Sequence, residues 1–307
     1  MTSSDSEGVE LKHDRPTYVF SRLSPNLTKV VEYDSFTQYP FLYLIHGKDK
    51  LVLLDTGCGS GDLAGFVTSH ELNPRKLPVY VVCSHSHFDH IGGNWHFSGP
   101  GGKASFCVEL AFGEGRRDYT EHWKANIFGD QVKDFAITKW LADGETIQMG
   151  PEPDTTEDIR VIHTPGHTPD EIALYYAKER RLFVGDSFYQ WQPIFIPKDG
   201  ESLDAFKGSV SRLLTLVESE EAKDSQASPI VMCCGHVDDF LPARTALQQV
   251  EKLVSGIQDG SLPHIKNTAF GMQLDEYRLD SFSIGFMQDA LAENSTCCYS
   301  GSGHTHQ

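Results

Sequence analysis

The sequence of 307 residues lacks several features that mark common protein classes. No apolar run reaches the length of a membrane span, and the mean hydropathy is −0.34. Basic residues are few, since 26 Lys and Arg stand against 43 Asp and Glu, which gives a formal charge of −17. This balance repels phosphate backbones and anionic lipids, so we expect no nucleic-acid partner and no membrane partner.

Cysteine is sparse, and the N-terminus has no secretory character. The first residues, 1–7, have neither the basic flank nor the apolar stretch of a signal peptide. The seven cysteines are odd in number and scattered, whereas a secreted disulfide scaffold would be denser and evenly paired. We therefore expect free thiols in a reducing compartment and a cytoplasmic enzyme, with its oligomeric state left open.

Short apolar runs separated by turns indicate an α/β protein. We expect a flexible segment at 1–16, one domain at 17–292 and a flexible tail at 293–307. The patterns predict strands at 18–20, 27–31, 41–45, 51–54, 79–82, 104–108, 159–162, 172–176, 182–184 and 230–233. They predict helices at 63–70, 203–220 and 243–254. Strands followed by a helix occur twice, which indicates two similar halves. The segment 113–129 has no clean period, and we interpret it as a surface excursion over a pocket or an ordinary connecting loop.

A dense polar string follows the predicted strand at 79–82. Within six residues it contains His85, His87, Asp89 and His90. Alternate residues of an extended strand end point the same way, so His85 and His87 would face one position. Asp89 and His90 lie past the turn and would face a second position nearby. Imidazole and carboxylate groups are ligands that zinc prefers, so the string predicts a metal site.

Three later residues occupy comparable places. His167, Asp186 and His236 each follow a predicted strand, in the segments TPGHT, VGD and GH. Each alone is as well explained by a turn or by a helix cap. Four strand-end placements in one chain indicate a shared metal centre.

These motifs, HSHFDH at 85–90, TPGHT at 164–168, VGD at 184–186 and GH at 235–236, together with LDTG at 54–57, resemble those of the metallo-β-lactamase superfamily. The resemblance implies a four-layer αββα sandwich with the metals at the sheet edge. It implies two Zn²⁺ per chain, with iron or manganese as alternatives. It assigns the first metal to His85, His87 and His167, the second to Asp89, His90 and His236, and the bridge to Asp186. Asp55 would hold the metal loops in place.

Two divalent cations about 3.5–4 Å apart would generate a bridging hydroxide near neutral pH, which could attack an activated carbonyl. The candidate catalytic residues are Asp89, already assigned to a metal, and Tyr189. Tyr189 lies three residues after Asp186, at the offset where some lactonases and acyl-thioester hydrolases of this superfamily place a substrate-contacting tyrosine. An aromatic residue of the pocket wall or of the core explains Tyr189 equally well.

The substrate class is inferred from the residues that follow Asp186. An apolar pocket for an acyl or aromatic group, or else part of the core, is predicted from Phe188, Tyr189, Trp191, Phe195 and Ile196. We therefore expect a small-molecule substrate, a hydrophobic ester, thioester or lactone. The alternatives are a mononuclear iron sulfur dioxygenase of the same fold and a glyoxalase II-type hydroxyacylglutathione hydrolase. A metal-scaffolded binding protein is disfavoured because it needs no bridging aspartate.

Overall fold

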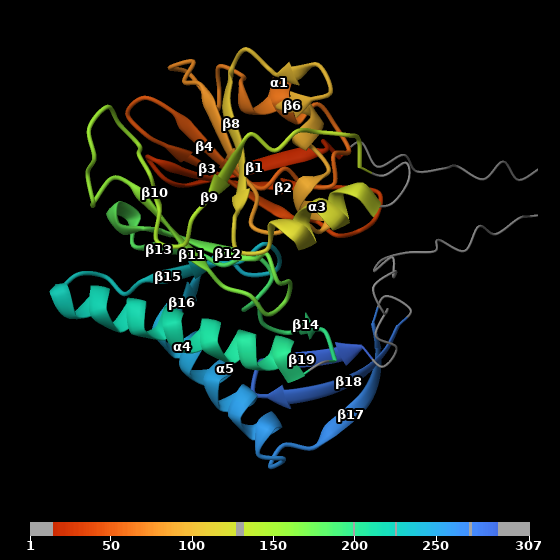
Figure 1. Cartoon of the computed structure of the whole chain (residues 1–307). Coiled ribbons are helices and arrows are strands. Elements are labelled where there is room, and N and C mark those ends of the chain that lie inside the picture. Colours follow the sequence, from red (N-terminus) through yellow and green to blue (C-terminus); the bar gives the residue numbers. More distant parts are fainter. Residues whose placement is uncertain (1–14, 127–131, 199, 225, 270–271, 288–307) are drawn as a thin grey trace, which may run out of the picture.

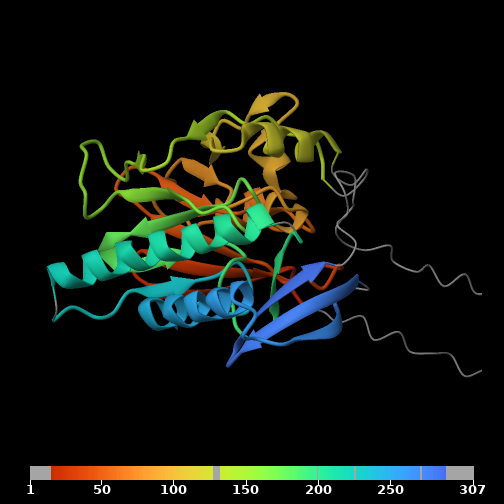
Figure 2. The same cartoon turned by 60° about the horizontal axis from the view of Figure 1, so that its bottom comes forward.

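Two large β-sheets carry most of the strands (Figures 1 and 2). The structure, a computed structural model, describes residues 15–126, 132–198, 200–224, 226–269 and 272–287. The predicted flexible segments at 1–16 and 293–307 lie outside these residues, apart from positions 15 and 16.

The first sheet has the order β1-β2-β3-β4-β5-β8-β9. Its strands are β1 (Tyr18–Ser24), β2 (Leu27–Glu32), β3 (Phe41–His46), β4 (Leu51–Leu54), β5 (Val79–Val82), β8 (Cys107–Gly113) and β9 (Lys139–Leu141). The first four strands pair antiparallel, and β4, β5, β8 and β9 pair parallel. A short hairpin is formed by β6 (Ser98–Gly99) and β7 (Gly102–Lys103).

The second sheet has the order β10-β11-β12-β13-β15-β16. Its strands are β10 (Thr146–Ile147), β11 (Ile159–His163), β12 (Ile172–Tyr176), β13 (Arg181–Phe183), β15 (Val231–Cys233) and β16 (Leu241–Pro242). A third, smaller sheet has the order β14-β19-β18-β17. It contains β14 (Pro193–Ile196), β17 (His264–Ala269), β18 (Met272–Leu279) and β19 (Phe282–Met287).

Helices cover the outer faces of the two large sheets (Figure 1). The helices are α1 (Leu63–Val67), α2 (Phe88–Ile91), α3 (Arg117–Asn126), α4 (Gly200–Lys223) and α5 (Ala243–Gln258), with 3₁₀ turns η1 (Asn94–His96) and η2 (Ala177–Glu179). Figure 2 shows α4 and α5 on the same side of the second sheet.

Strand β4 illustrates why the layers form. Its four residues are all apolar and all buried, because both faces of the strand are covered. Leu51 and Leu53 join a cluster with Leu63 and Val67 of α1. Val52 and Leu54 join the cluster between the sheets, which also contains residues of β11 and β12. A third cluster fills the space between the second sheet and α4 and α5. Three apolar clusters between four layers confirm the predicted αββα sandwich.

Two predicted segments differ from the structure. The strand expected at 104–108 is β8, which starts at Cys107, because its register is set by parallel pairing of Cys107 with Val79 of β5. The segment 113–129, interpreted as a surface excursion over a pocket or as a connecting loop, contains the helix α3. This helix is polar, so it carries no apolar period to detect. Among its described side chains Thr120 is buried, and its hydroxyl donates a hydrogen bond to the Asp170 carboxylate at 2.8 Å.

The helix α4 is anchored through Phe206, whose side chain is fully buried and stacks on Phe188 with ring centroids 5.5 Å apart. We expect Phe206→Ala to lower the free energy of unfolding by about 3–5 kcal/mol, because the cavity is left in a packed layer. Denaturant unfolding measures this change. The exposed Glu218 on the same helix gives the control, and Glu218→Ala should change stability by less than about 0.5 kcal/mol. A Phe206→Ala protein as stable as the wild type would contradict the packing described.

Candidate metal centre

The predicted ligands come together at one edge of the two large sheets. His85 and His87 follow β5, while His167, Asp186 and His236 follow β11, β13 and β15. The parallel pairs β4–β5 and β13–β15 bring these strand ends to the same edge. All of these ligands lie in loops. Asp89 and His90 instead lie on α2, the single helical turn after the loop that carries His85 and His87.

The seven side chains form two groups, in each of which the ligand atoms lie within 4.8 Å of one another. The first group is His85, His87 and His167, and the second is Asp89, His90, Asp186 and His236. In the first group, Nε2 of His167 lies 3.0 Å from Nδ1 of His87. In the second, Nε2 of His236 lies 3.2 Å from Oδ2 of Asp89. The first group contains the three residues that the resemblance assigns to the first metal, and the second contains the three assigned to the second metal together with Asp186, which the resemblance assigns to the bridge.

The Asp186 carboxylate lies between the two groups. Its Oδ1 is 3.2 Å from Nε2 of His90, and its Oδ2 is 3.4 Å from Nε2 of His236. The same Oδ2 is 3.9 Å from Nε2 of His167 in the first group. A carboxylate in this position can give an oxygen to a cation on either side, as a bridging ligand must.

Asp55 organises the loop that carries the histidines. Its Oδ1 accepts the backbone N–H of Ser84 at 2.7 Å, and its Oδ2 accepts the Ser84 hydroxyl at 2.9 Å. Nδ1 of His90 lies 2.9 Å from the same Oδ2, and because a carboxylate only accepts, this nitrogen donates. The Ser84 hydroxyl, already donating, accepts from Nδ1 of His85 at 3.0 Å. One aspartate thereby sets the ring orientation of a histidine in each group.

Backbone carbonyls orient two further histidines. Nδ1 of His167 donates to the carbonyl of Phe195 at 2.8 Å, and Nδ1 of His236 donates to the carbonyl of Gln38 at 3.0 Å. A carbonyl cannot donate, so both rings carry their proton on Nδ1 and offer the Nε2 lone pair to the centre. No sequence pattern marked Phe195 or Gln38 for this part, because any residue type can supply a carbonyl.

Glu171 is a buried carboxylate that the sequence reasoning missed. It accepts the backbone N–H of Asp186 at 3.0 Å and the hydroxyl of Ser187. Burial raises the pKa of Glu171 well above its usual value, and the neighbouring Asp186 adds to the shift. Glu171 follows His167 by four residues and directly precedes the apolar strand β12. An acidic residue placed between a ligand motif and a buried strand is the signal that could have identified it.

Two glycines allow the backbone to approach this cluster. Gly185 has φ +53°, and a Cβ there would lie 2.6 Å from a Glu171 oxygen. A Cβ on Gly235 would lie 2.5 Å from Oδ1 of Asp186. Any side chain at either position would therefore displace the bridging carboxylate or its support.

Orphaned buried atoms show that the residues fit a cation. Nε2 of His85 is buried without a hydrogen-bond partner among the described residues, and Nε2 of His90 and Oδ1 of Asp186 face each other at 3.2 Å without a well-formed hydrogen bond. Such atoms are costly unless something binds them. Imidazole nitrogens and carboxylate oxygens in this arrangement fit a transition-metal ion such as zinc.

The two groups differ in their electrostatics. Burial lowers the pKa of His87 to about 3, with a further contribution from His167, and burial also lowers the pKa of His85 and of His167. These rings are neutral and present lone pairs. In the second group, burial would lower the pKa of His90 and His236, but nearby carboxylates outweigh it and raise both. A bound cation would take the place of those protons.

Tyr189 lies next to this centre. Its ring is buried and stands nearly perpendicular to the His236 ring, with centroids 6.3 Å apart. Burial, and then the charge of Asp186, raise the pKa of its hydroxyl well above the usual value, so the hydroxyl keeps its proton. The other residues predicted to line a pocket differ in their burial. Phe188 and Ile196 belong to the core, whereas Phe195 is half-buried and Trp191 is exposed.

The five described cysteines, Cys58, Cys83, Cys107, Cys233 and Cys234, are free and buried, as predicted. Cys297 and Cys298 lie outside the described residues. Among the described residues, no helix combines the length and apolar character needed to cross a membrane.

Comparisons with known proteins add a family match and several relatives. A profile described as "Metallo-beta-lactamase superfamily" matches residues 39–229. The Aspergillus versicolor protein avaE, provisionally named as a transcription factor, is 26% identical over 92% of this chain and 91% of its own. The human acyl-coenzyme A thioesterase MBLAC2 is 27% identical over 58% of this chain and 68% of its own. A β-lactamase domain protein from Burkholderia ambifaria has a similar structure, with a TM-score of 0.60 and 18% identity, covering 78% of this chain and 77% of that one.

The hydrogen bonds of Asp55 generate a prediction about metal affinity. We expect Asp55→Ala to weaken metal binding by about 10–100-fold, because His90 loses its hydrogen-bond partner and the Ser84 hydroxyl that accepts from His85 is no longer held in place. Metal competition titrations on the purified protein measure the affinity. Asp62, an exposed carboxylate that caps α1 outside the centre, gives the control Asp62→Ala, which should bind metal like the wild type. Equal affinities in the two variants would remove Asp55 from this role.

Proposed function

The chain belongs to the metallo-beta-lactamase superfamily and is a metal-dependent hydrolase, and from that premise we propose that it hydrolyses the thioester of a hydrophobic acyl group with two zinc ions. The observation that carries the proposal of two ions is the position of Asp186 between two ligand groups, each able to hold one.

The residues of the centre have distinct tasks in this reaction. Two bound zinc ions would lower the pKa of water to near neutral and polarise the carbonyl of the substrate. The first-group imidazoles are neutral and so are ready to bind a cation without releasing protons. Asp55 and Glu171 hold His90 and Asp186 in place, which fixes the geometry before substrate arrives. The proposed role of Tyr189 is to donate its hydroxyl proton in a hydrogen bond to the carbonyl or to the leaving atom.

Exposed apolar residues beside the centre support a hydrophobic acyl group. Trp191, Tyr39 and Val237 are 77%, 41% and 39% exposed. Val237 follows the ligand His236 directly, and Tyr39 follows the residue whose carbonyl holds that ring. Trp191 lies near the loop that carries His236, because the backbone N–H of its neighbour Gln190 donates a hydrogen bond to the Asp238 carboxylate at 2.7 Å. Large apolar groups left in water around a polar centre are typical of a surface that binds apolar ligands.

The relatives support a thioester among the possible substrates. MBLAC2, which aligns with more than half of this chain, is named an acyl-coenzyme A thioesterase. Lactones and oxygen esters remain the alternatives for the same centre. A hydroxyacylglutathione hydrolase would differ in the leaving thiol, and a sulfur dioxygenase would differ in holding one iron ion.

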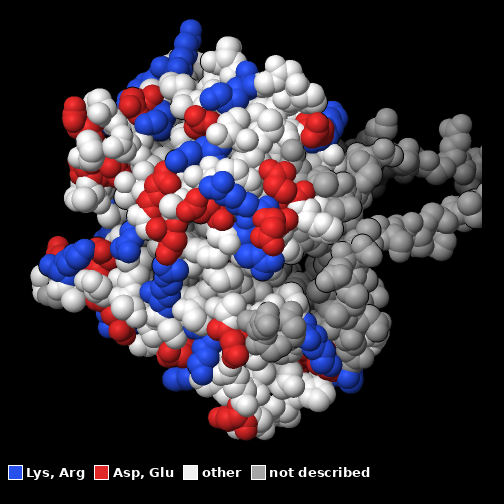
Figure 3. Space-filling model, in the orientation of Figure 1, with Lys and Arg blue, Asp and Glu red and all other residues white. Residues whose placement is uncertain are grey.

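The name of avaE raises a different class, because a transcription factor binds DNA. The charge of −17 opposes a phosphate backbone. On the face drawn in Figure 3, acidic and basic side chains of the described residues are intermixed. A track of basic residues for DNA is therefore unsupported on this face. We propose a small-molecule substrate as the partner, and the cytoplasm as the location because the five described thiols are unpaired.

A hydrolysis panel tests this function. We expect the zinc-loaded protein to hydrolyse medium- and long-chain acyl-CoA faster than short-chain acyl-CoA, glutathione thioesters, lactones and β-lactams. His87→Ala and Asp186→Asn should each lower kcat by at least about 100-fold, because polarisation by the metals contributes several kcal/mol. The exposed His70 outside the centre supplies the control His70→Ala, with unchanged kcat.

The metal content and the substrates that the protein turns over distinguish the alternatives. Two zinc ions per chain support the proposal, whereas one iron ion with oxygen consumption on a persulfide substrate would overturn it. Hydrolysis of lactones but of no thioester would support the metal centre and would contradict the proposed substrate class. Near wild-type activity in Asp186→Asn would remove Asp186 from the reaction.

Tyr189→Phe tests the proposed hydrogen bond of its hydroxyl. Since the ring is kept, its packing against His236 is preserved and only the hydroxyl is lost. We expect kcat to fall by about 10²–10³-fold for alkyl esters and lactones, whose alkoxide leaving groups need a proton donor. Thioesters and p-nitrophenyl esters should lose less, because their leaving groups depart without help. A response that is equal for all leaving groups would assign Tyr189 to the pocket wall.

A further inference from the structure

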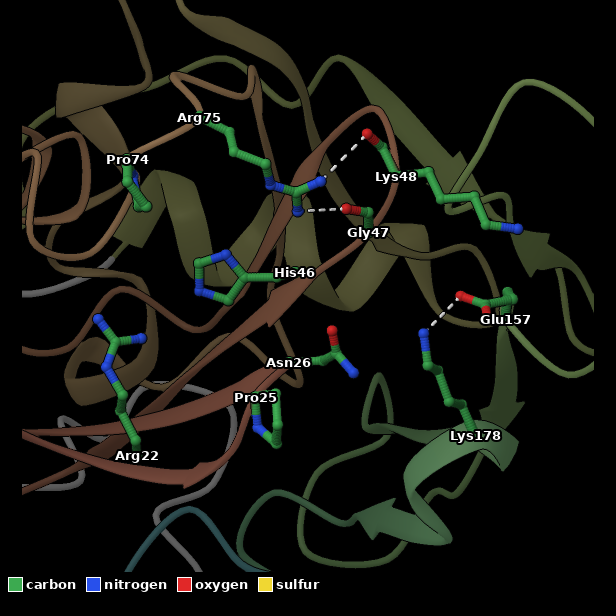
Figure 4. Close-up of a pocket in the computed structure, with 10 residues that line it drawn as sticks. All are labelled: Arg22, Pro25, Asn26, His46, Gly47, Lys48, Pro74, Arg75, Glu157 and Lys178. Carbon is green, nitrogen blue, oxygen red and sulfur yellow. Dashed lines mark hydrogen bonds and ion pairs between the residues drawn. The ribbon is translucent and has the colours of Figure 1, made fainter.

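A basic pocket opens between the two large sheets, at the edge opposite the metal centre. Figure 4 shows the residues that line it. Its volume is about 350 Å³, which is in the range of small-molecule sites, about 300–1,000 Å³. Its charged and titratable lining residues are Arg22, His46, Lys48, Arg75, Glu157 and Lys178.

The strands separate this basic pocket from the metal centre. His46 ends β3 and pairs with Leu51 at the start of β4, whereas Asp55 follows the end of β4. Arg75 precedes β5, while His85 follows that strand. In the second sheet, Glu157 precedes β11, and His167 follows it. A four-residue strand spans about 13 Å, so a ligand in the basic pocket would lie well away from the reacting carbonyl.

In the part of the chain that the structure describes, the two arginines of the basic pocket have no acidic partner. Lys178 pairs with Glu157 at 2.9 Å, and Lys48 lies 3.8 Å from Asp154. Among the described residues, no carboxylate lies within ion-pair distance of Arg22 or Arg75.

The arginines bond to backbone carbonyls instead. Arg22 donates to the carbonyl of Glu71 at 2.6 Å, and Arg75 donates to the carbonyl of Gly47 at 2.6 Å. A carbonyl carries no net charge, so two positive charges stay uncompensated in a chain whose formal charge is −17. Guanidinium groups also keep further N–H donors, arranged in a fork that matches an oxyanion.

His46 lies among these cations. Figure 4 shows its ring with Arg75 on one side and Arg22 on the other. Burial, together with the charges of Arg75 and Arg22, lowers the pKa of His46 to about 4. The ring is therefore neutral at pH 7 and adds no charge. Its Nε2 is buried and has no hydrogen-bond partner among the described residues.

We propose that the basic pocket binds the phosphoryl group of a small molecule, held by the guanidinium groups of Arg22 and Arg75. A phosphate monoester carries a charge of about −1.5 to −2 at pH 7, which matches the two uncompensated charges. The remaining volume has room for a small organic group attached to the phosphate. This site is independent of the hydrolase function, because none of its residues belongs to the metal centre.

Calorimetric titration of the zinc-loaded protein tests the site. Inorganic phosphate, pyrophosphate and glycerol phosphate are the probes, with citrate and chloride as other anions. We expect the phosphoryl compounds to bind, and Arg22→Gln and Arg75→Gln each to weaken binding by about 10–100-fold, since each removes a charge-assisted hydrogen bond. Arg116→Gln, at an exposed arginine outside the pocket, should leave the affinity unchanged. Glycerol phosphate that binds more tightly than inorganic phosphate indicates an organic phosphate as the ligand, and the reverse order indicates the free ion.

Two further measurements keep the test decisive if a variant is less stable. Arg75→Lys keeps the charge but loses the fork, so it should bind more weakly than the wild type while melting at a similar temperature. Phosphate should also raise the pKa of His46, which proton NMR follows and which folding alone would not move. Unchanged affinity in both Arg→Gln variants, or citrate binding as tightly as pyrophosphate, would overturn the proposal. Thioester hydrolysis by the same samples tests the other function separately.

Discussion

Burying an ionisable side chain costs several kcal/mol unless its polar atoms find partners, and this protein buries six of its seven candidate ligands, all except the half-buried His87, at one sheet edge. Much of the surrounding structure compensates for that cost. The Asp55 carboxylate accepts a hydrogen bond from Nδ1 of His90, and two backbone carbonyls accept hydrogen bonds from Nδ1 of His167 and of His236. Glu171 accepts a hydrogen bond from the backbone N–H of Asp186. The ring nitrogens and carboxylate oxygens that remain without a hydrogen bond face the interior of the centre, where a cation would bind. The ring orientations, the loop conformations and the two close glycines all follow from this requirement.

The conformation of the surrounding loops shows the same constraint. Asp55, Tyr39, Trp191 and Val237 have φ of +62°, +51°, +66° and +60°, in the left-handed region that non-glycine residues seldom adopt. A residue held there costs of order 1–3 kcal/mol and persists only where its surroundings fix it. At Asp55 the fixing contacts are the hydrogen bonds to Ser84. Lys76, Arg180 and Asp280 have the same conformation in turns that carry no ligand, so part of this strain lies elsewhere, and near the centre it accompanies the sharp turns that present ligands and rim residues together.

The sequence predicted what is local and left out what depends on distant contacts. The ligand string at 85–90 is contiguous, and β4, β5 and β12 are bounded by turn residues, so both were found from spacing alone. The small sheet of β14 with β17 to β19 was not predicted. Strand β14 pairs with β19 across about 90 residues, and β17 and β18, although they pair with each other, are interrupted by polar and charged residues that hide an apolar pattern. Helix α3 carries no apolar period, and Gln38 and Phe195 act through their carbonyls. The catalytic role of Tyr189 stays a prediction.

The division of the centre between the two halves has a consequence for synthesis on the ribosome. Four ligands lie at 85–90, and His236 follows about 150 residues later. At about 5–20 residues per second, the first half waits roughly 7–30 s for its last ligand to emerge. During that interval the early histidines can bind a cation only incompletely, without Asp186 to share it. Because metal binding and folding are linked, tight capture of the ions should come after docking of the halves, and it would lock a completed chain rather than a nascent one.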